Sequence, residues 1–327
     1  MDMKKRLFFV SLLVMSVFIS SSINAKAKSQ QKGKQDFANV VLFAYFKDQQ
    51  GGKEYFANNS TEIMKQYDGS QKTSLKEYMK SISYGQFEVH NIFPQSTDGQ
   101  INAYEIQNHT SDEAMRNGID NSVISEIMKN IPDLKNQIID YDNDGYIDNL
   151  TIMLYGGLDT PGSTITTLYP HKSNYPESTF TWSQKKISNY NMLNTVRFQE
   201  PKGDKSGLLI HEFLHSLNYP DLYTTNNEVP VGRWDIMAFS SKYVSYPLAY
   251  LRYHFTQWID IPEVNTSTTG LTLDVQSNPD GNQAYILKSP YNDNEFFVVE
   301  MRKKGKVGTD DYDIAIKGDG LIVYRVN

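Results

Sequence analysis

The stretch that constrains this chain most is GLLIHEFLHSLNYPDLY, residues 207–223. On a helix, His211 and His215 lie one turn apart on the same face, with Glu212 beside them. A separate apolar stripe follows the i, i+3, i+4, i+7 pattern and consists of Ile210, Phe213, Leu214 and Leu217. The pattern predicts a helix that is buried along one side and presents two imidazoles and a carboxylate on another. Such a helix suits a zinc site.

A catalytic zinc ion takes three protein ligands and keeps one open position for water, so a third ligand is needed. Asn218 follows the histidines where the helix has to stop, and asparagine is the non-glycine residue that best tolerates the left-handed conformation of a helix C-cap. Pro220 prevents the helix from continuing. The chain therefore reverses and returns Asp221 toward the histidines, and we predict Asp221 as the third zinc ligand.

Glu212 can hydrogen-bond a zinc-bound water but cannot reach the ion itself from its place on the helix. Zinc lowers the pKa of its water to about 7, so a neighbouring carboxylate can take the proton and pass it to a leaving amine. Neither a cysteine nor a Gly-x-Ser-x-Gly elbow offers a competing nucleophile. The alternative is a core helix with purely structural histidines. Of the other histidines, His171 can approach the cleft, while structural or surface roles are expected for His90, His109 and His254.

A second motif, DYDNDGYIDNLT at residues 140–151, has the spacing of a calcium loop. Aspartates stand at loop positions 1, 3, 5 and 9, glycine stands at the tight turn, and the seventh position offers its backbone carbonyl. Thr151 replaces the usual bidentate glutamate and a strand-like segment follows, so we expect a calcium loop outside an EF-hand pair. The alternative is an ordinary turn rich in Asp, Asn and Gly. The predicted calcium ligands are Asp140, Asp142, Asp144, Tyr146 and Asp148.

The N-terminus has the pattern of a secretory signal, residues 1–27, in which Lys4, Lys5 and Arg6 precede an apolar run and small residues. The run is short for a membrane span, so a retained anchor is the less favoured alternative and no stable membrane insertion is expected after removal of the signal. Residues 28–36 are polar and are expected to be disordered. A secreted chain without cysteine suggests a Gram-positive bacterium, and a net charge of −6 gives no reason to expect nucleic acid as a partner.

The rest of the chain alternates between strand and helix patterns. Apolar or alternating segments predict strands at residues 39–46 and 86–93 and after the calcium loop. Helices are expected at 74–83 with Ser74 as N-cap, at 112–131 and at 245–259. Residues 156–204 are expected to form loops and edge strands along a cleft. We assign a catalytic domain to residues 37–267 and a continuous β-rich section, with strands LTLDV, QAYILKS, EFFVVEMR and GLIVYRV, to residues 268–327. The sequence stops directly after the last strand, so a further C-terminal part is expected.

Together, HEFLHSLNYPDLY and VGRWDIMAFSS resemble the immune inhibitor A family of secreted bacterial zinc metallopeptidases, which are related to the metzincins. NVVLFAYF, SISYGQFEV, the calcium-loop block, FFVVEMR and GDGLIVYRV are similar to segments of the same family in the same order. The resemblance implies an α/β (α+β) zincin or metzincin-like fold with a mixed twisted sheet and an active-site helix. It also implies zinc ligation by His211, His215 and Asp221, Glu212 as the base, and Met237 as the methionine of a turn beneath the metal.

Two positions depart from the family pattern. Asn218 replaces a glycine, which the C-cap argument makes tolerable, and Phe239 stands where many metzincins have a tyrosine that can stabilise the oxyanion. That support would then come from zinc, from backbone amides or from a side chain such as Tyr223.

The main hypothesis from the sequence is a secreted, calcium-stabilised zinc endopeptidase, monomeric, that acts on proteins or peptides. The alternative is a secreted binding protein or adhesin on the same scaffold, with a structural metal.

Overall fold

The computed structural model describes residues 34–111, 113–114, 121–134, 136–156, 170–175, 181–196, 206–223, 228–240, 243–264, 267–292, 295–309 and 311–327. All of them belong to one compact unit, Gln31–Asn327. The predicted signal, residues 1–27, lies outside the described residues. None of the described helices combines the length and the apolar character that crossing a membrane requires.

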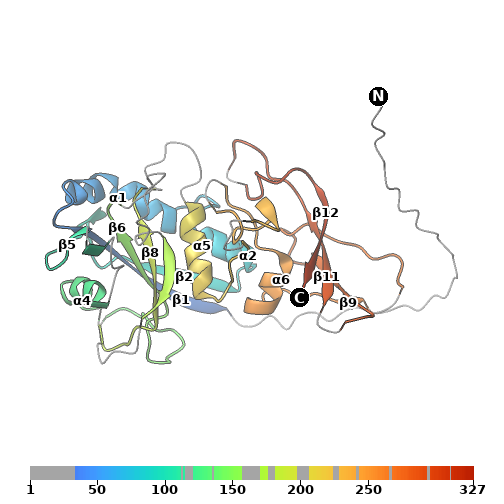
Figure 1. The fold of residues 1–327 in the computed structure, drawn as a ribbon, viewed down its shortest axis with the longest axis horizontal. Helices are drawn as coiled ribbons and strands as arrows, with labels where there is room; N and C mark the ends of the chain where they lie inside the picture. The colour runs from blue at the N-terminus through green and yellow to red at the C-terminus, as the bar shows by residue number, and fades with distance from the viewer. Residues whose placement is uncertain are drawn as a thin grey trace. The chain divides into compact units, whose positions relative to one another are not determined.

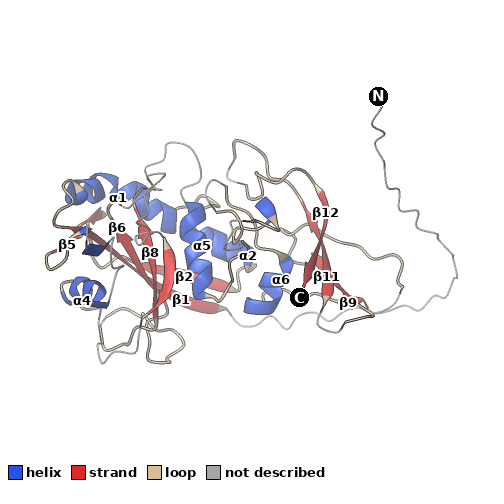
Figure 2. Ribbon diagram, in the orientation of Figure 1, coloured by secondary structure: helices blue, strands red, loops and turns tan. Residues whose placement is uncertain are grey.

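A twisted six-stranded mixed sheet carries the first part of the unit (Figures 1 and 2). Its strand order is β2 (Phe87–Ile92), β1 (Gln35–Phe46), β6 (Leu150–Leu154), β8 (Asn189–Asn194) and β7 (His171–Asn174), and β5 (Tyr104–Ile106) pairs with the end of β1. These strands pair in parallel except β7, which is antiparallel to β8 and forms an edge of the described sheet.

The sheet is covered on both faces, which explains the continuous apolar run in β1. Val41 and Phe43 face a layer formed by α1 (Gly52–Asp68), α2 (Leu75–Ile82) and α5 (Ser206–Ser216). Val40 and Leu42 point to the opposite face, where α4 (Asn121–Lys129) packs. Successive residues of a strand point to opposite faces, so β1 contributes to both hydrophobic layers. The general prediction of a mixed α/β fold is confirmed.

A second, four-stranded sheet follows the order β12 (Gly320–Val326), β11 (Phe296–Arg302), β10 (Ala284–Lys288) and β9 (Glu263–Val264). Buried Arg302 bridges Glu300 and Asp313, and the Asp313 carboxylate also accepts from the backbone N–H of Tyr246, at 3.1 Å. Smaller elements are β3 (Ser96–Thr97) paired with β4 (Gln100–Ile101), the one-turn helices η2 (Gly232–Trp234) and α6 (Ala249–Leu251), and the π-helix η3 (Arg252–Thr256).

Several sequence predictions need correction. β1 begins at Gln35, so the end of the predicted disordered segment 28–36 is already strand. The sequence reading missed α1, in which the buried Phe56, Ile63 and Tyr67 stand among polar residues and give a weak periodic signal. The helix expected at 245–259 is limited to residues 249–256, and LTLDV makes no strand because only Val275 pairs, in an isolated bridge. Since β9 precedes residue 268, the second sheet crosses the predicted domain boundary.

Other local predictions hold. The Oγ atom of Ser74 accepts from the Glu77 backbone N–H at the start of α2, as its N-cap role requires. Of the helix expected at 112–131, α4 and residues 113–114 are helical, while residues 112 and 115–120 lie outside the described residues. The region 156–204 contributes the edge strand β7, as expected, but it also contains β8, which lies inside the sheet.

Candidate metal centre

The helix α5 ends in a turn that directs the following chain back toward its own histidines. Asn218 has a φ of 65°, the left-handed conformation predicted from the sequence. The Tyr219 backbone N–H donates to the Leu214 carbonyl at 3.2 Å, and the Asn218 N–H donates to the His215 carbonyl at 3.0 Å. These two bonds define a Schellman motif. The motif ends the helix and starts the reversal that brings Asp221 beside the histidines.

Three acceptor atoms meet at this turn. The Nε2 atoms of His211 and His215 are 3.2 Å apart, and Oδ1 of Asp221 lies 3.2 Å from the first and 3.3 Å from the second. Ligand atoms bound tetrahedrally to zinc at about 2.0–2.1 Å would lie about 3.3–3.4 Å from one another. The spacing of the three atoms therefore fits three of the four positions around a zinc ion.

Backbone carbonyls orient both imidazoles. Nδ1 of His211 donates to the Ile236 carbonyl at 3.1 Å, and Nδ1 of His215 donates to the Tyr219 carbonyl at 2.7 Å. A carbonyl only accepts, so each Nδ1 carries a proton and each neutral ring keeps its Nε2 lone pair free. With both rings neutral, the three clustered atoms include no donor. Three lone-pair atoms of this kind bind a cation best.

Burial and neighbouring groups shift the pKa values of Asp221, His211 and Glu212. Partial burial disfavours ionised Asp221, but the two imidazoles, when they are protonated and donate to it, outweigh burial and hold the pKa of this carboxyl well below its usual range. Burial acts to lower the pKa of His211, yet Asp221 and Glu212 raise it overall. Burial raises the pKa of Glu212.

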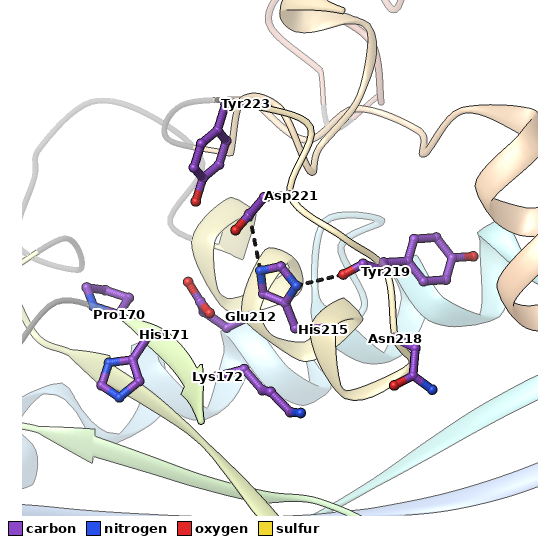
Figure 3. Close-up of a pocket in the computed structure, with 9 residues that line it drawn as sticks. All are labelled: Pro170, His171, Lys172, Glu212, His215, Asn218, Tyr219, Asp221 and Tyr223. Carbon is purple, nitrogen blue, oxygen red and sulfur yellow. Dashed lines mark hydrogen bonds and ion pairs between the residues drawn. The ribbon is translucent and has the colours of Figure 1, made fainter. Parts of the chain in front are cut away.

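Glu212 lies beside this group without belonging to it. Its side chain is 4 % exposed, and Oε2 has no hydrogen-bond partner among the described residues. Figure 3 shows its carboxylate directed into a pocket of about 330 Å³, on whose far side stand Pro170, His171 and Lys172 of the β7 segment. A buried carboxylate oxygen without a partner is costly, which marks Glu212 as a group that interacts with something bound in the pocket.

The wall above the site carries Tyr223, whose ring stacks on that of His211 at a centroid distance of 6.4 Å. Its hydroxyl points toward Asp221 and Glu212 in Figure 3. Burial and the nearby Asp221 carboxylate raise the pKa of Tyr223 well above its usual value, so the phenol keeps its proton. Phe239 does not line the pocket and instead packs under the Arg233 guanidinium, 4.5 Å from the ring centroid.

The turn that contains Met237 lies against the site through its backbone. Ile236 accepts from His211, and the Met237 carbonyl accepts from the Leu222 N–H at 3.0 Å, next to Asp221. The fully buried Asp235 holds the turn in shape, because its carboxylate accepts from the backbone N–H groups of Met237 and Leu248, each at 2.6 Å. Sequence reasoning named Met237 but missed Asp235, although it stands in the same WDIM motif.

A buried polar network anchors the end of α5 to the sheet, and sequence reasoning missed it. The Ser216 hydroxyl donates to Oδ1 of Asn149 at 2.7 Å and accepts from Nδ2 of Asn191 at 3.1 Å. Asn149 in turn donates to Oδ1 of Asn39 in β1 at 2.9 Å. The single signal available in the sequence was the presence of asparagines in otherwise apolar strands.

The predicted calcium loop brings together part of its predicted ligand set. Carboxylate oxygens of Asp140, Asp142 and Asp148 lie within 4.8 Å of one another, and Gly145 takes the expected left-handed turn at φ 90°. Asp144 is outside this group, and its Oδ1 accepts from the Tyr146 N–H at 2.8 Å. Nζ of Lys185 contacts Oδ2 of Asp140 at 2.6 Å. The following β6 confirms that a strand, not a second helix, follows the loop.

Comparisons with known proteins assign the chain to no family. No protein-family model matches the sequence, and no curated protein matches it. Among solved structures, the chain is similar to wild-type OgpA from Akkermansia muciniphila, with a TM-score of 0.38 and 12% sequence identity over 90% of this chain and 85% of that one.

Proposed function

We propose that the protein is a zinc-dependent endopeptidase with a zincin-like catalytic domain. The observation that carries the proposal is the triangle of His211 Nε2, His215 Nε2 and Asp221 Oδ1, with sides of 3.2 to 3.3 Å, beside the unpaired Oε2 of Glu212. A structural zinc site is closed by four protein ligands, whereas three ligands and an adjacent carboxylate are the requirements of hydrolysis.

The residues have separate roles in this proposal. Zinc held by the three ligands would lower the pKa of a water and polarise the peptide carbonyl. Glu212, whose pKa is raised by burial, accepts the water proton and delivers it to the leaving amine. Tyr223 keeps its proton and can donate a hydrogen bond to the oxyanion, a role for which Phe239 has neither the hydroxyl nor a place in the pocket.

The strand β7 supports a peptide as the substrate. It is an edge strand of the described sheet and its residues His171 and Lys172 line the pocket opposite Glu212. An extended peptide can add to such an edge through backbone hydrogen bonds, which would carry its scissile bond past the candidate metal centre.

The test combines metal analysis of the purified full chain with cleavage of a peptide library. Glu212→Gln should retain zinc and lose roughly 10²–10⁴-fold in kcat/KM, because only the general base is removed. Glu54→Gln, an exposed change at the start of α1, is the matched control and should behave like the unaltered protein. A Glu212→Gln variant that cleaves within tenfold of the unaltered chain would refute the assignment.

The alternative from the sequence, a binding protein with a structural metal, predicts a different outcome. The zinc-loaded protein would then cleave no library peptide, although zinc would bind. The unpaired Glu212 favours catalysis, because a purely structural site has no use for it. Calcium at Asp140, Asp142 and Asp148, secretion and the monomeric state stay predictions.

A further inference from the structure

The side chain of Lys172 lies on the same side of the sheet as the helix α5. Lys172 in β7 pairs with Asn191 in β8, and Nδ2 of Asn191 bonds the Ser216 hydroxyl at the end of α5. Alternation along the strand turns the His171 ring to the other face, where it contacts Tyr190 of the opposite core layer, although His171 also borders the pocket. Figure 3 shows the Lys172 side chain below His215, with its ammonium end directed toward the side of Asn218.

The ammonium group of Lys172 has no carboxylate partner among the described residues. Its hydrogen-bond acceptor there is the neutral Oδ1 of Asn174, at 3.1 Å. The pocket also contains the carboxylates of Glu212 and Asp221. A bound zinc ion would balance these two negative charges, so the charge of Lys172 would leave the pocket lining positive. The chain as a whole, by contrast, has a net charge of −6.

We propose that Lys172 is a specificity-determining residue that selects substrates with an aspartate or glutamate side chain at the position seated against β7. The inference rests on the proposed peptidase function and adds the substrate class to it. A carboxylate placed beside a partly buried ammonium gains charge attraction and a charge-assisted hydrogen bond, whereas its amide isostere gains only a neutral one. The attraction is weakened by the solvent that still reaches the open pocket, so a moderate preference is expected.

The test measures kcat/KM of the zinc-loaded full chain on peptide pairs that differ by Glu or Gln at each position around the cleaved bond. At one position the Glu peptide should be preferred about three- to tenfold, a range that corresponds to roughly 0.7–1.4 kcal/mol. The preference should fall in high salt, because the interacting charges are partly exposed. The ratio within each pair cancels any general change in activity.

Two substitutions and one control decide the origin of the preference. Lys172→Gln should bring the Glu/Gln ratio to about one, and Lys172→Glu should invert it. Lys303→Gln makes the same charge change at an exposed site directly after β11, outside the pocket, and should keep the preference. Cleavage without an acidic preference, or a preference that survives Lys172→Gln, would overturn this inference alone. The absence of any cleavage by the zinc-loaded chain would overturn the proposed function with it.

Discussion

The helix C-cap at Asn218 allows a prediction that links backbone conformation to the metal centre. Asn218→Ala should destabilise the protein relative to Asn218→Gly, because the residue must hold a φ of 65°. The left-handed conformation costs a residue with a Cβ about 1–2 kcal/mol. Glycine avoids that strain but loses about 0.4–1 kcal/mol through the greater freedom of its unfolded chain. The alanine variant should therefore be less stable than the glycine variant by about 0.8 kcal/mol, the difference between the midpoints of the two ranges.

The comparison isolates the backbone, because the Asn218 side chain is exposed and makes no hydrogen bond to a described residue. Urea unfolding in the presence of a chelator measures the difference without the stabilisation that bound metal would add. Zinc affinity, measured separately by competition with a chromogenic chelator, should also fall in the alanine variant, since the cap positions Asp221 three residues further on. An alanine variant as stable as the glycine variant would refute the reasoning.

Three further predictions concern the support of the site and the calcium loop. Ser216→Ala should cost about 1–3 kcal/mol in urea unfolding, because it removes the hydroxyl that bonds both Asn149 and Asn191 and leaves Oδ1 of Asn149 and Nδ2 of Asn191 with the long 3.4 Å bond between them; a loss below about 0.5 kcal/mol would contradict the network's role. Burial raises the pKa of Asp235 from 3.8 to about 6, so its contribution to stability is complete below pH 3.8 and is lost as the pH rises through about 6. Relative to Asp235→Asn, the unaltered protein should lose roughly 2 kcal/mol of unfolding free energy between pH 4 and pH 7, and a flat difference would count against this. Saturating calcium should raise the melting temperature, and Asp142→Ala should remove that increase; no calcium effect on the unaltered protein would favour the ordinary turn.

Several features of the site follow from local sequence alone. They depend on residues within about three helical turns of one another: the four-residue spacing of His211 and His215, the left-handed conformation of Asn218, and Pro220, which prevents the helix from continuing. The structure accordingly brings Asp221 to the histidines as predicted. The apolar run in β1 likewise indicated a strand covered on both faces, because each of its residues must be buried on one side or the other.

The surroundings of that site could be known only from the tertiary structure. Three of its neighbours come from distant parts of the chain. The Ile236 carbonyl that orients His211 is 25 residues away, and Asn149, which bonds Ser216, is 67 residues away. Lys172, across the pocket, belongs to the strand β7. Their meeting depends on strand order and register, which periodicity does not encode. The sequence by itself determined a helix, a turn and the meeting of His211, His215 and Asp221, because these depend on spacing within one segment. The tertiary structure alone decided what faces them, because packing of distant elements selects one arrangement among many that the same local patterns allow.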